Sequence, residues 1–151
     1  MVSDLEDLRK KISKEMAKNS NLQQNNVINI LKSYVGNDWK KYININQEKY
    51  NKEKICTEEN FDMYIITWNK FQRSKIHDHS INGCVYKTLL GNLKEQIYNS
   101  KLEKISEGFL NKNSVGSITN NIGYHNIIND SEVSVSIHIY SPPNYDTKFY
   151  N

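Results

Sequence analysis

Residues 132–141, with the sequence EVSVSIHIYS, alternate apolar and polar side chains and constrain the fold more than any other stretch. Valine and isoleucine occupy every second position from 133 to 139, and Ser134, Ser136, His138 and Tyr140 take the positions between and after them. Because successive side chains of a strand point to opposite faces, this pattern predicts a strand with one apolar and one polar face. The polar face would point to solvent in an ordinary sheet, or would line a ligand-holding interior in an antiparallel barrel.

The chain beyond Lys52 has the same strand-like texture. β-Branched and aromatic residues gather there in short runs, which glycine, asparagine or serine separate. These runs are FDMYIITW (61–68), GCVYKTLL (83–90), NLKEQIY (92–98), LEKISEGFL (102–110) and SVGSIT (114–119). Many short strands joined by turns predict a mainly β fold, either a sandwich or a barrel.

The N-terminal segment predicts helices instead. Ser3 and Glu6 form a capping-box signature, so we expect a helix to begin at Ser3. Its apolar residues recur at helical spacing and are Leu5, Leu8, Ile12 and Met16. We therefore expect an amphipathic helix, followed by the polar break KNSNLQQNN at 18–26.

A second helix is expected after this break. Its apolar stripe consists of Val27, Ile30, Leu31 and Tyr34. It should end at Gly36, because glycine adopts the positive φ of a helix C-terminus without strain. Asp38 is then expected to cap a short third helix, WKKYI at 39–43.

The length of 151 residues predicts one domain, with a helical segment at 1–45 and a β-barrel at 46–151. Lys and Arg number 20 and Asp and Glu 17, and the net charge of +3 is spread along the chain, which argues against a nucleic-acid partner. No apolar run reaches the roughly 20 residues that a membrane-spanning helix needs, and the N-terminus does not resemble a secretory signal. We expect a cytoplasmic monomer whose two cysteines, Cys56 and Cys84, are free thiols.

The four histidines point to a metal. His77 and His79 are two residues apart, so on a strand both imidazoles would share one face. His125 and His138 complete the set. Imidazoles without clustered thiolates suit zinc, iron, copper or nickel, although a short H-x-H pattern is also compatible with hydrogen-bonded histidines that bind no metal.

The spacing around these histidines resembles a known motif. After His79 come four residues, Cys84, six residues and Gly91, which resembles the first motif of the cupin superfamily in the form found in cysteine dioxygenases. In most cupins a glutamate that binds the metal stands at the position of Cys84. The resemblance continues in order through DWKKY, Y-x-K, ITW, LLGNLKE, NIGYHNIIN and SVSIHIYSPP, over roughly residues 38–143.

The resemblance implies a mainly β fold, a jelly-roll-like cupin barrel after an N-terminal helical segment. It implies that His77, His79 and His125 bind Fe(II). The substrates would be a small thiol, L-cysteine, and O2, with the thiol held through its sulfur and amine beside the oxygen. The product would be cysteine sulfinic acid.

The resemblance also implies roles around the metal. Cys84 and Tyr140 match a cysteine and a tyrosine that can join as a thioether. The alternative interpretation of Cys84 is a small buried apolar residue. Ser136, His138 and Tyr140 share one strand face, and His138 is expected to hydrogen-bond Tyr140 and not the metal. The SPP turn resembles one with a cis bond before its first proline, here Ser141–Pro142.

Tyr50, Lys52 and Trp68 match the substrate-binding positions. The family has an arginine where Lys52 stands, and lysine offers a point charge in place of a two-pronged guanidinium. Arg73 could supply the missing guanidinium, but a solvated loop charge is its simpler interpretation. Affinity or substrate choice is therefore expected to differ from the family pattern.

Three alternatives share this site. One is oxidation of another thiol, such as 3-mercaptopropionate, cysteamine or an N-terminal cysteine, with cysteamine ranked lower because Lys52 favours a carboxylate. Another is a catalytically silent cupin that binds a metal or a small thiol as a sensor. The last is a structural barrel that holds zinc.

Overall fold

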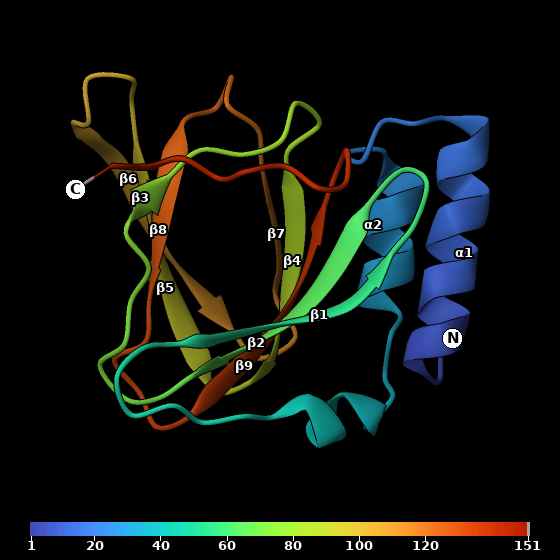
Figure 1. Cartoon of the computed structure of the whole chain (residues 1–151), viewed down its shortest axis with the longest axis horizontal. Coiled ribbons are helices and arrows are strands. Elements are labelled where there is room, and N and C mark those ends of the chain that lie inside the picture. The colour runs from blue at the N-terminus through green and yellow to red at the C-terminus, as the bar shows by residue number, and fades with distance from the viewer. Residues whose placement is uncertain (151) are drawn as a thin grey trace.

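The fold consists of two five-stranded antiparallel sheets with two helices against one of them (Figure 1). The structure is a computed structural model and describes residues 1–150. The first sheet has the order β1-β2-β9-β4-β7 and the second has the order β10-β3-β8-β5-β6. The predicted mainly β fold is therefore confirmed.

The six predicted runs all form strands, and four further strands join them. The predicted strands are β2 (Asp62–Trp68), β4 (Cys84–Leu90), β5 (Asn92–Tyr98), β6 (Lys104–Asn111), β7 (Val115–Ile118) and β9 (Ser134–Tyr140). The strands that the pattern did not predict are β1 (Asn51–Thr57), β3 (Ile76–His77), β8 (Tyr124–Ile128) and β10 (Phe149–Tyr150). The first sheet thus gains an edge strand, and the second gains three of its five.

The two faces of β9 are both buried, and they face opposite environments. Its apolar side chains Val135, Ile137 and Ile139 join a core that includes residues of the helices. Its polar side chains point the other way, between the two sheets, where Ser136 and His138 are 2% and 3% exposed. The polar face therefore lines a protein interior and does not face solvent.

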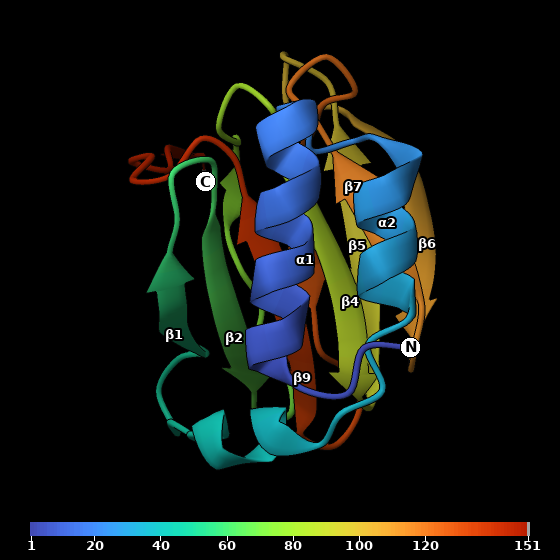
Figure 2. The same ribbon diagram turned by 90° about the vertical axis from the view of Figure 1, so that its right-hand side faces the viewer.

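The helices cover the outer face of the first sheet. Figure 2 shows α1 (Leu5–Lys18) lying in front of β2, β9 and β4, and α2 (Asn25–Lys32) beside it over β4 and β7. The predicted apolar stripe of α1 is buried, with Leu8 and Ile12 at 0% exposure. Each such side chain stabilises the fold by roughly 1.5–3 kcal/mol when it leaves water.

The start of α1 differs from the prediction by one residue. Its N-terminal cap is Asp4, whose Oδ1 accepts a hydrogen bond of 2.7 Å from the backbone N–H of Asp7. Ser3 lies outside the helix because Val2 next to it forms a bridge with Tyr34, which keeps the chain extended there. The expected capping box of Ser3 and Glu6 is therefore wrong.

The end of α2 also differs, because the helix stops at Lys32. The buried ammonium of Lys87 caps this end of the helix. It donates hydrogen bonds to the carbonyls of Leu31, Lys32 and Tyr34 at 3.3, 2.9 and 2.7 Å. Gly36 has no positive φ; a side chain there would instead meet the carbonyl oxygen of Ser3 at 2.4 Å. Close approach of two segments, and not helix termination, requires this glycine.

Asp38 lies in the first turn of a 3-10 helix, η1 (Asp38–Tyr42), and does not cap that helix. Its Oδ2 accepts a hydrogen bond of 2.9 Å from the backbone N–H of Leu5, and its Oδ1 accepts one of 2.6 Å from the Tyr34 hydroxyl. The residue thus caps the distant start of α1. The prediction of a short helix here is confirmed, and the predicted role of Asp38 is wrong.

Three smaller expectations can be compared with the fold. The Ser141–Pro142 bond is cis, as expected. Cys56 and Cys84 are free, as expected. Within residues 1–150, no helix has both the length and the apolar character needed to cross a membrane.

Candidate metal centre and substrate cavity

Three histidines from two segments of the chain meet between the two sheets. His77 on β3 pairs in register with His125 on β8. His79 follows β3 and lies outside any strand, so the expectation that one strand carries both residues of the H-x-H pair is wrong. One ring nitrogen from each imidazole lies within 4.8 Å of the others, and all three residues are buried.

Hydrogen bonds fix the orientation of two of these imidazoles. The Nδ1 of His77 donates to the carbonyl oxygen of Lys75 at 2.8 Å, and the Nδ1 of His125 donates to Glu95 Oε2 at 2.7 Å. Each neutral ring then carries its lone pair on Nε2. The two Nε2 atoms are 3.0 Å apart, so two lone pairs face each other. A cation bound by both nitrogens removes this repulsion.

The imidazole of His79 has no hydrogen-bond partner on either nitrogen among the described residues, although both atoms are buried. Its backbone is held firmly, because Asn120 Oδ1 accepts from the His79 N–H and Asn120 Nδ2 donates to the His79 carbonyl, both at 2.9 Å. A buried polar group without a partner costs roughly 1–3 kcal/mol. A metal ion bound by His79, His77 and His125 removes this cost, so the three residues fit a metal.

The electrostatics of the three rings favour the form that binds metals. Burial lowers the pKa of His77 to about 4. Burial also lowers the pKa of His79 and that of His125, and the neighbouring histidines add to the effect. The imidazoles are therefore neutral at pH 7, as metal ligation requires.

Glu95 on β5 is a site residue that sequence reasoning missed. Besides accepting from His125, its Oε2 accepts a short hydrogen bond from the Tyr86 hydroxyl. Burial raises the pKa of Glu95, and the bond from Tyr86 lowers it in part. A signal was present: Glu95 shares one strand face with the apolar Leu93 and Ile97, both of which contact the interior cluster. A carboxylate between two inward-facing apolar residues indicates an interior role.

The polar face of β9 forms a chain of hydrogen bonds. Trp68 Nε1 donates to Ser136 Oγ at 3.0 Å, and Ser136 Oγ lies 2.8 Å from His138 Nε2. Because the serine oxygen already accepts from Trp68, its hydrogen is available for Nε2, and the His138 proton then lies on Nδ1. That Nδ1 is 3.8 Å from Cys84 Sγ.

The expected hydrogen bond between His138 and Tyr140 is not formed. Their rings are nearly parallel, with an interplanar angle of 15° and centroids 6.0 Å apart. The bonding partners of His138 are Ser136 and the Cys84 sulfur instead. Both ring nitrogens of His138 are directed to these two partners, so neither is available to the Tyr140 hydroxyl.

Cys84 and Tyr140 are brought together by strand register. They are directly paired across the antiparallel strands β4 and β9. Side chains of such a pair share one face of the sheet, with Cβ atoms roughly 4.5–5.5 Å apart. Cys84 is fully buried, and this burial raises the pKa of its thiol.

Lys52 on β1 exposes part of its side chain to solvent, while its ammonium lies against two aromatic rings at the inner cavity. Its Nζ is 4.4 Å from the ring centroid of Tyr64 and 4.5 Å from that of Tyr140. Within the described part of the chain it forms no ion pair. The protein walls lower the pKa of this ammonium by excluding solvent, and Cys84 and Asp62 oppose that shift.

Two adjoining cavities lead to the histidines. The inner cavity, of about 50 Å³, is lined by Tyr50, Lys52, Ile66, Trp68, Ser74, His77, His125, Ile127, His138, Tyr140, Thr147 and Phe149. The predicted substrate-binding residues Tyr50, Lys52 and Trp68 thus lie together, and the rings of Tyr50 and Trp68 stack at 4.6 Å. A cavity of this size admits only a small ligand.

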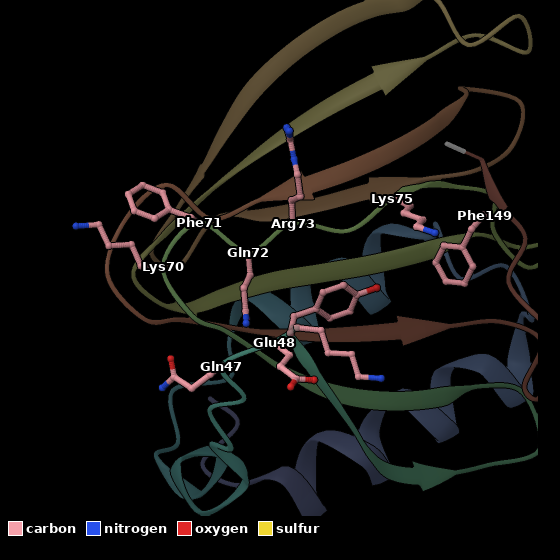
Figure 3. Close-up of a pocket in the computed structure, with 10 residues that line it drawn as sticks. Gln47, Glu48, Lys70, Phe71, Gln72, Arg73, Lys75 and Phe149 are labelled. Carbon is pink, nitrogen blue, oxygen red and sulfur yellow. The ribbon is translucent and has the colours of Figure 1, made fainter.

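The outer cavity, of about 760 Å³, shares Tyr50 and Phe149 with the inner one. Figure 3 shows Phe149 at one end of it and Phe71 at the other. Arg73 borders this outer cavity, is exposed, and points away from Glu48 in Figure 3. It does not line the inner cavity, which agrees with its interpretation as a solvated charge.

The protein-family model described as "Cysteine dioxygenase type I" matches residues 2–151. The chain belongs to the cysteine dioxygenase type I family. It is 32% identical to cysteine dioxygenase type 1 of Danio rerio over 152 residues, which cover 92% of this chain and 75% of the relative. It is 33% identical to the Bos taurus enzyme of that name over 129 residues, which cover 78% of this chain and 64% of the relative. The family resemblance is therefore confirmed.

Solved structures agree on the fold of this cysteine dioxygenase family member. A Klebsiella pneumoniae protein with a double-stranded β-helix domain matches with a TM-score of 0.63 and 11% identity, over 74% of this chain and 93% of that one. A cupin superfamily protein from Desulfitobacterium hafniense matches with a TM-score of 0.53 and 11% identity, over 67% and 84%. The predicted cupin barrel is thus confirmed.

Proposed function

We propose that this chain is an iron-dependent thiol dioxygenase that oxidises L-cysteine with O2 to cysteine sulfinic acid. The observation that carries the proposal is the pair of Nε2 atoms of His77 and His125, 3.0 Å apart, beside the unpartnered imidazole of His79. Membership of the cysteine dioxygenase type I family supports it. The reaction balances without an external reductant, because both atoms of O2 join the sulfur and no group leaves.

His77, His79 and His125 are the proposed ligands of Fe(II). Three imidazole ligands leave coordination positions open, and a bound Fe(II) supplies a place where the thiol sulfur and O2 meet. The protein orients the ligands from outside: Glu95 holds His125, the Lys75 carbonyl holds His77, and Asn120 holds the backbone of His79. Such outer partners raise ligand basicity and fix the ring orientation.

Lys52 is the proposed partner of the substrate carboxylate. Among the described residues that line the inner cavity, Lys52 is the one lysine or arginine, and it stands at the position of the family's arginine. Within residues 1–150 it forms no ion pair. Tyr50 and Trp68 form the stacked aromatic wall beside it.

Cys84 and Tyr140 are the proposed partners in a thioether link. The link joins Cys84 Sγ to a ring carbon of Tyr140 and removes one hydrogen from each residue, a two-electron oxidation for which O2 is the oxidant. Their direct pairing across β4 and β9 supports it. We assign Ser136 and His138 the task of holding the Cys84 sulfur and the phenol face in place, since His138 stands next to both.

The test is oxygen uptake by the iron-loaded protein with L-cysteine, with the product identified by mass spectrometry. We expect one sulfinic acid formed for each O2 consumed. His77→Ala should lose iron, measured by metal analysis, and keep its circular-dichroism spectrum, because the residue lies in a two-residue strand outside the helix-covered core. Absence of sulfinate from every small thiol tried would overturn the proposal.

A second candidate substrate is 3-mercaptopropionate. Within the described residues, no aspartate or glutamate lines the inner cavity, so the metal would be the only partner there for the amino group of L-cysteine, and 3-mercaptopropionate has no amino group to place. Lys52 still provides the partner for a carboxylate. Comparison of kcat/KM for the two thiols decides between them, and a zinc-containing or inactive protein would select the structural or the silent cupin instead.

Three broader assignments belong to the same proposal. We propose a cytoplasmic location and a monomeric state. We also propose that residues 1–45 and 46–151 form a single cupin domain. Gel filtration with light scattering tests the monomer, and limited proteolysis between the two segments tests the domain assignment.

A further inference from the structure

Two tyrosine rings form a corner around the Lys52 ammonium. Tyr64 on β2 and Tyr140 on β9 lie at 86° to each other, with centroids 5.6 Å apart. The Lys52 Nζ lies 4.4 Å from one centroid and 4.5 Å from the other. We call Tyr64 and Tyr140 the aromatic corner.

The aromatic corner supplies what a lysine lacks. An arginine presents a planar fork that is already rigid, whereas a lysine ammonium is a point charge on a flexible stem. A cation within about 6 Å of an aromatic face is attracted to it. Two perpendicular faces at nearly equal distances therefore define one position for the ammonium, and they leave its N–H groups free for an anion.

The neighbouring lysine shows the contrast. Lys54 follows on the same face of β1, and its Nζ lies 5.8 Å from the Tyr64 centroid. It forms an ion pair with Asp62 at 3.7 Å. Lys54 thus has a carboxylate partner within the protein, whereas the two rings are the partners of Lys52 and its charge is available to a ligand.

We propose that Tyr64 is a positioning residue, which fixes the Lys52 ammonium where it receives the substrate carboxylate. The inference rests on the proposed function, in which Lys52 binds that carboxylate and Tyr140 takes part in the thioether. Tyr64 has no other task in that proposal. It is the residue through which a lysine can replace an arginine without loss of a defined anion site.

The consequence is a specific kinetic signature. Tyr64 acts on the substrate carboxylate through Lys52 and does not act on the reacting sulfur. Its ring should therefore affect KM for carboxylated thiols and leave kcat unchanged. Binding of a thiol without a carboxylate should not depend on the Tyr64 ring. A general structural defect would instead change every constant.

The kinetic test compares Tyr64→Leu with Tyr64→Phe. Loss of the ring should raise KM for L-cysteine about two- to fivefold, which matches the strength of a cation–π contact at an exposed site. Phe retains the ring and should retain the original KM. Cysteamine, used as a competitive inhibitor, should keep its inhibition constant in both variants.

A matched control is Tyr42→Leu. Tyr42 also has a lysine above its ring, with Lys41 Nζ at 5.4 Å from the centroid, but it lies on η1 away from the cavity. This variant should leave KM unchanged. An equal rise in KM for Tyr64→Phe, or a parallel change for cysteamine, would overturn the role of the ring.

A second measurement does not depend on turnover. The Cε proton resonance of Lys52, identified by its absence in Lys52→Arg, should be shifted upfield by the two ring faces, and Tyr64→Leu should reduce that shift. Anaerobic titration with L-cysteine, followed on this resonance, should give a Kd about two- to fivefold weaker in Tyr64→Leu. An unshifted resonance, or an equal Kd, would overturn the proposal even if no sulfinate were formed. Absence of sulfinate alone would count against the enzyme activity only.

Discussion

Replacement of Glu95 by glutamine should weaken metal binding about tenfold without unfolding the protein. Glu95 Oε2 accepts the Nδ1–H of His125 at 2.7 Å and a second bond from the Tyr86 hydroxyl. Glutamine keeps the size and one acceptor oxygen, but it removes the charge. A hydrogen bond to a charged group stabilises by about 1.5–3 kcal/mol and a neutral one by about 0.5–1.5 kcal/mol.

The difference of about 1.4 kcal/mol corresponds to the tenfold loss in affinity, and it lies at the lower end of what outer partners of metal ligands contribute. Glu95→Ala removes both bonds and should approach a hundredfold loss. The assay is anaerobic competition for Fe(II) against a coloured chelator, with thermal unfolding measured in parallel. The two variants should unfold as single cooperative transitions.

The matched control is Glu107→Gln on β6. Glu107 also accepts two bonds, from Gln96 Nε2 at 2.7 Å and from Lys104 Nζ at 3.2 Å, but it is exposed and, in the described chain, forms no hydrogen bond with a histidine. Its replacement should leave the metal affinity unchanged. If Glu95→Gln binds Fe(II) as tightly as Glu107→Gln, the assigned role of the carboxylate in orienting His125 is refuted.

Lys87→Met should lower the free energy of unfolding by about 2–4 kcal/mol, because three carbonyls at the end of α2 lose a charged donor. Urea titration measures this change, and Lys112→Met on the surface is the control that should have no effect. Burial raises the pKa of the Cys56 thiol to about 11, so alkylation at pH 8 should be slow in the folded protein and should accelerate toward pH 11, as mass spectrometry can follow. Gly116→Ala should lower the melting temperature and the metal affinity together, because the added Cβ would lie 2.4 Å from the Tyr86 ring and displace it; equal affinity would contradict this coupling.

Patterns that depend on near neighbours in the chain were predictable. The alternation in β9 correctly indicated two chemically different faces, and the spacing of His77, His79 and Cys84 led to the family. The six runs rich in β-branched and aromatic residues became strands. In each case the backbone geometry of a strand or helix sets which side chains share a face, so the spacing along the chain is enough to predict it.

Features that depend on partners far along the chain were not predictable. Asp38 caps a helix 33 residues away, and the pattern around it indicates only its own local turn. β1 carries lysines at the barrel mouth, so its sequence lacks the apolar alternation of a half-buried strand. His79 reaches the other histidines through its backbone bonds to Asn120, 41 residues later. Such contacts arise from the topology of the two sheets and leave no trace in local spacing.

The two faces of β9 have separate functions: the apolar face stabilises the fold, and the polar face lies in the site. Val135, Ile137 and Ile139 pack in the core that includes the helices. Ser136 and His138, at the alternate positions, lie on the face of the proposed site. Evolution can therefore retune the chemistry of the lumen by exchanging alternate residues of a strand whose remaining positions keep the molecule folded. A barrel of this kind separates the residues that must be kept from those that can diversify, and it does so at intervals of a single peptide unit.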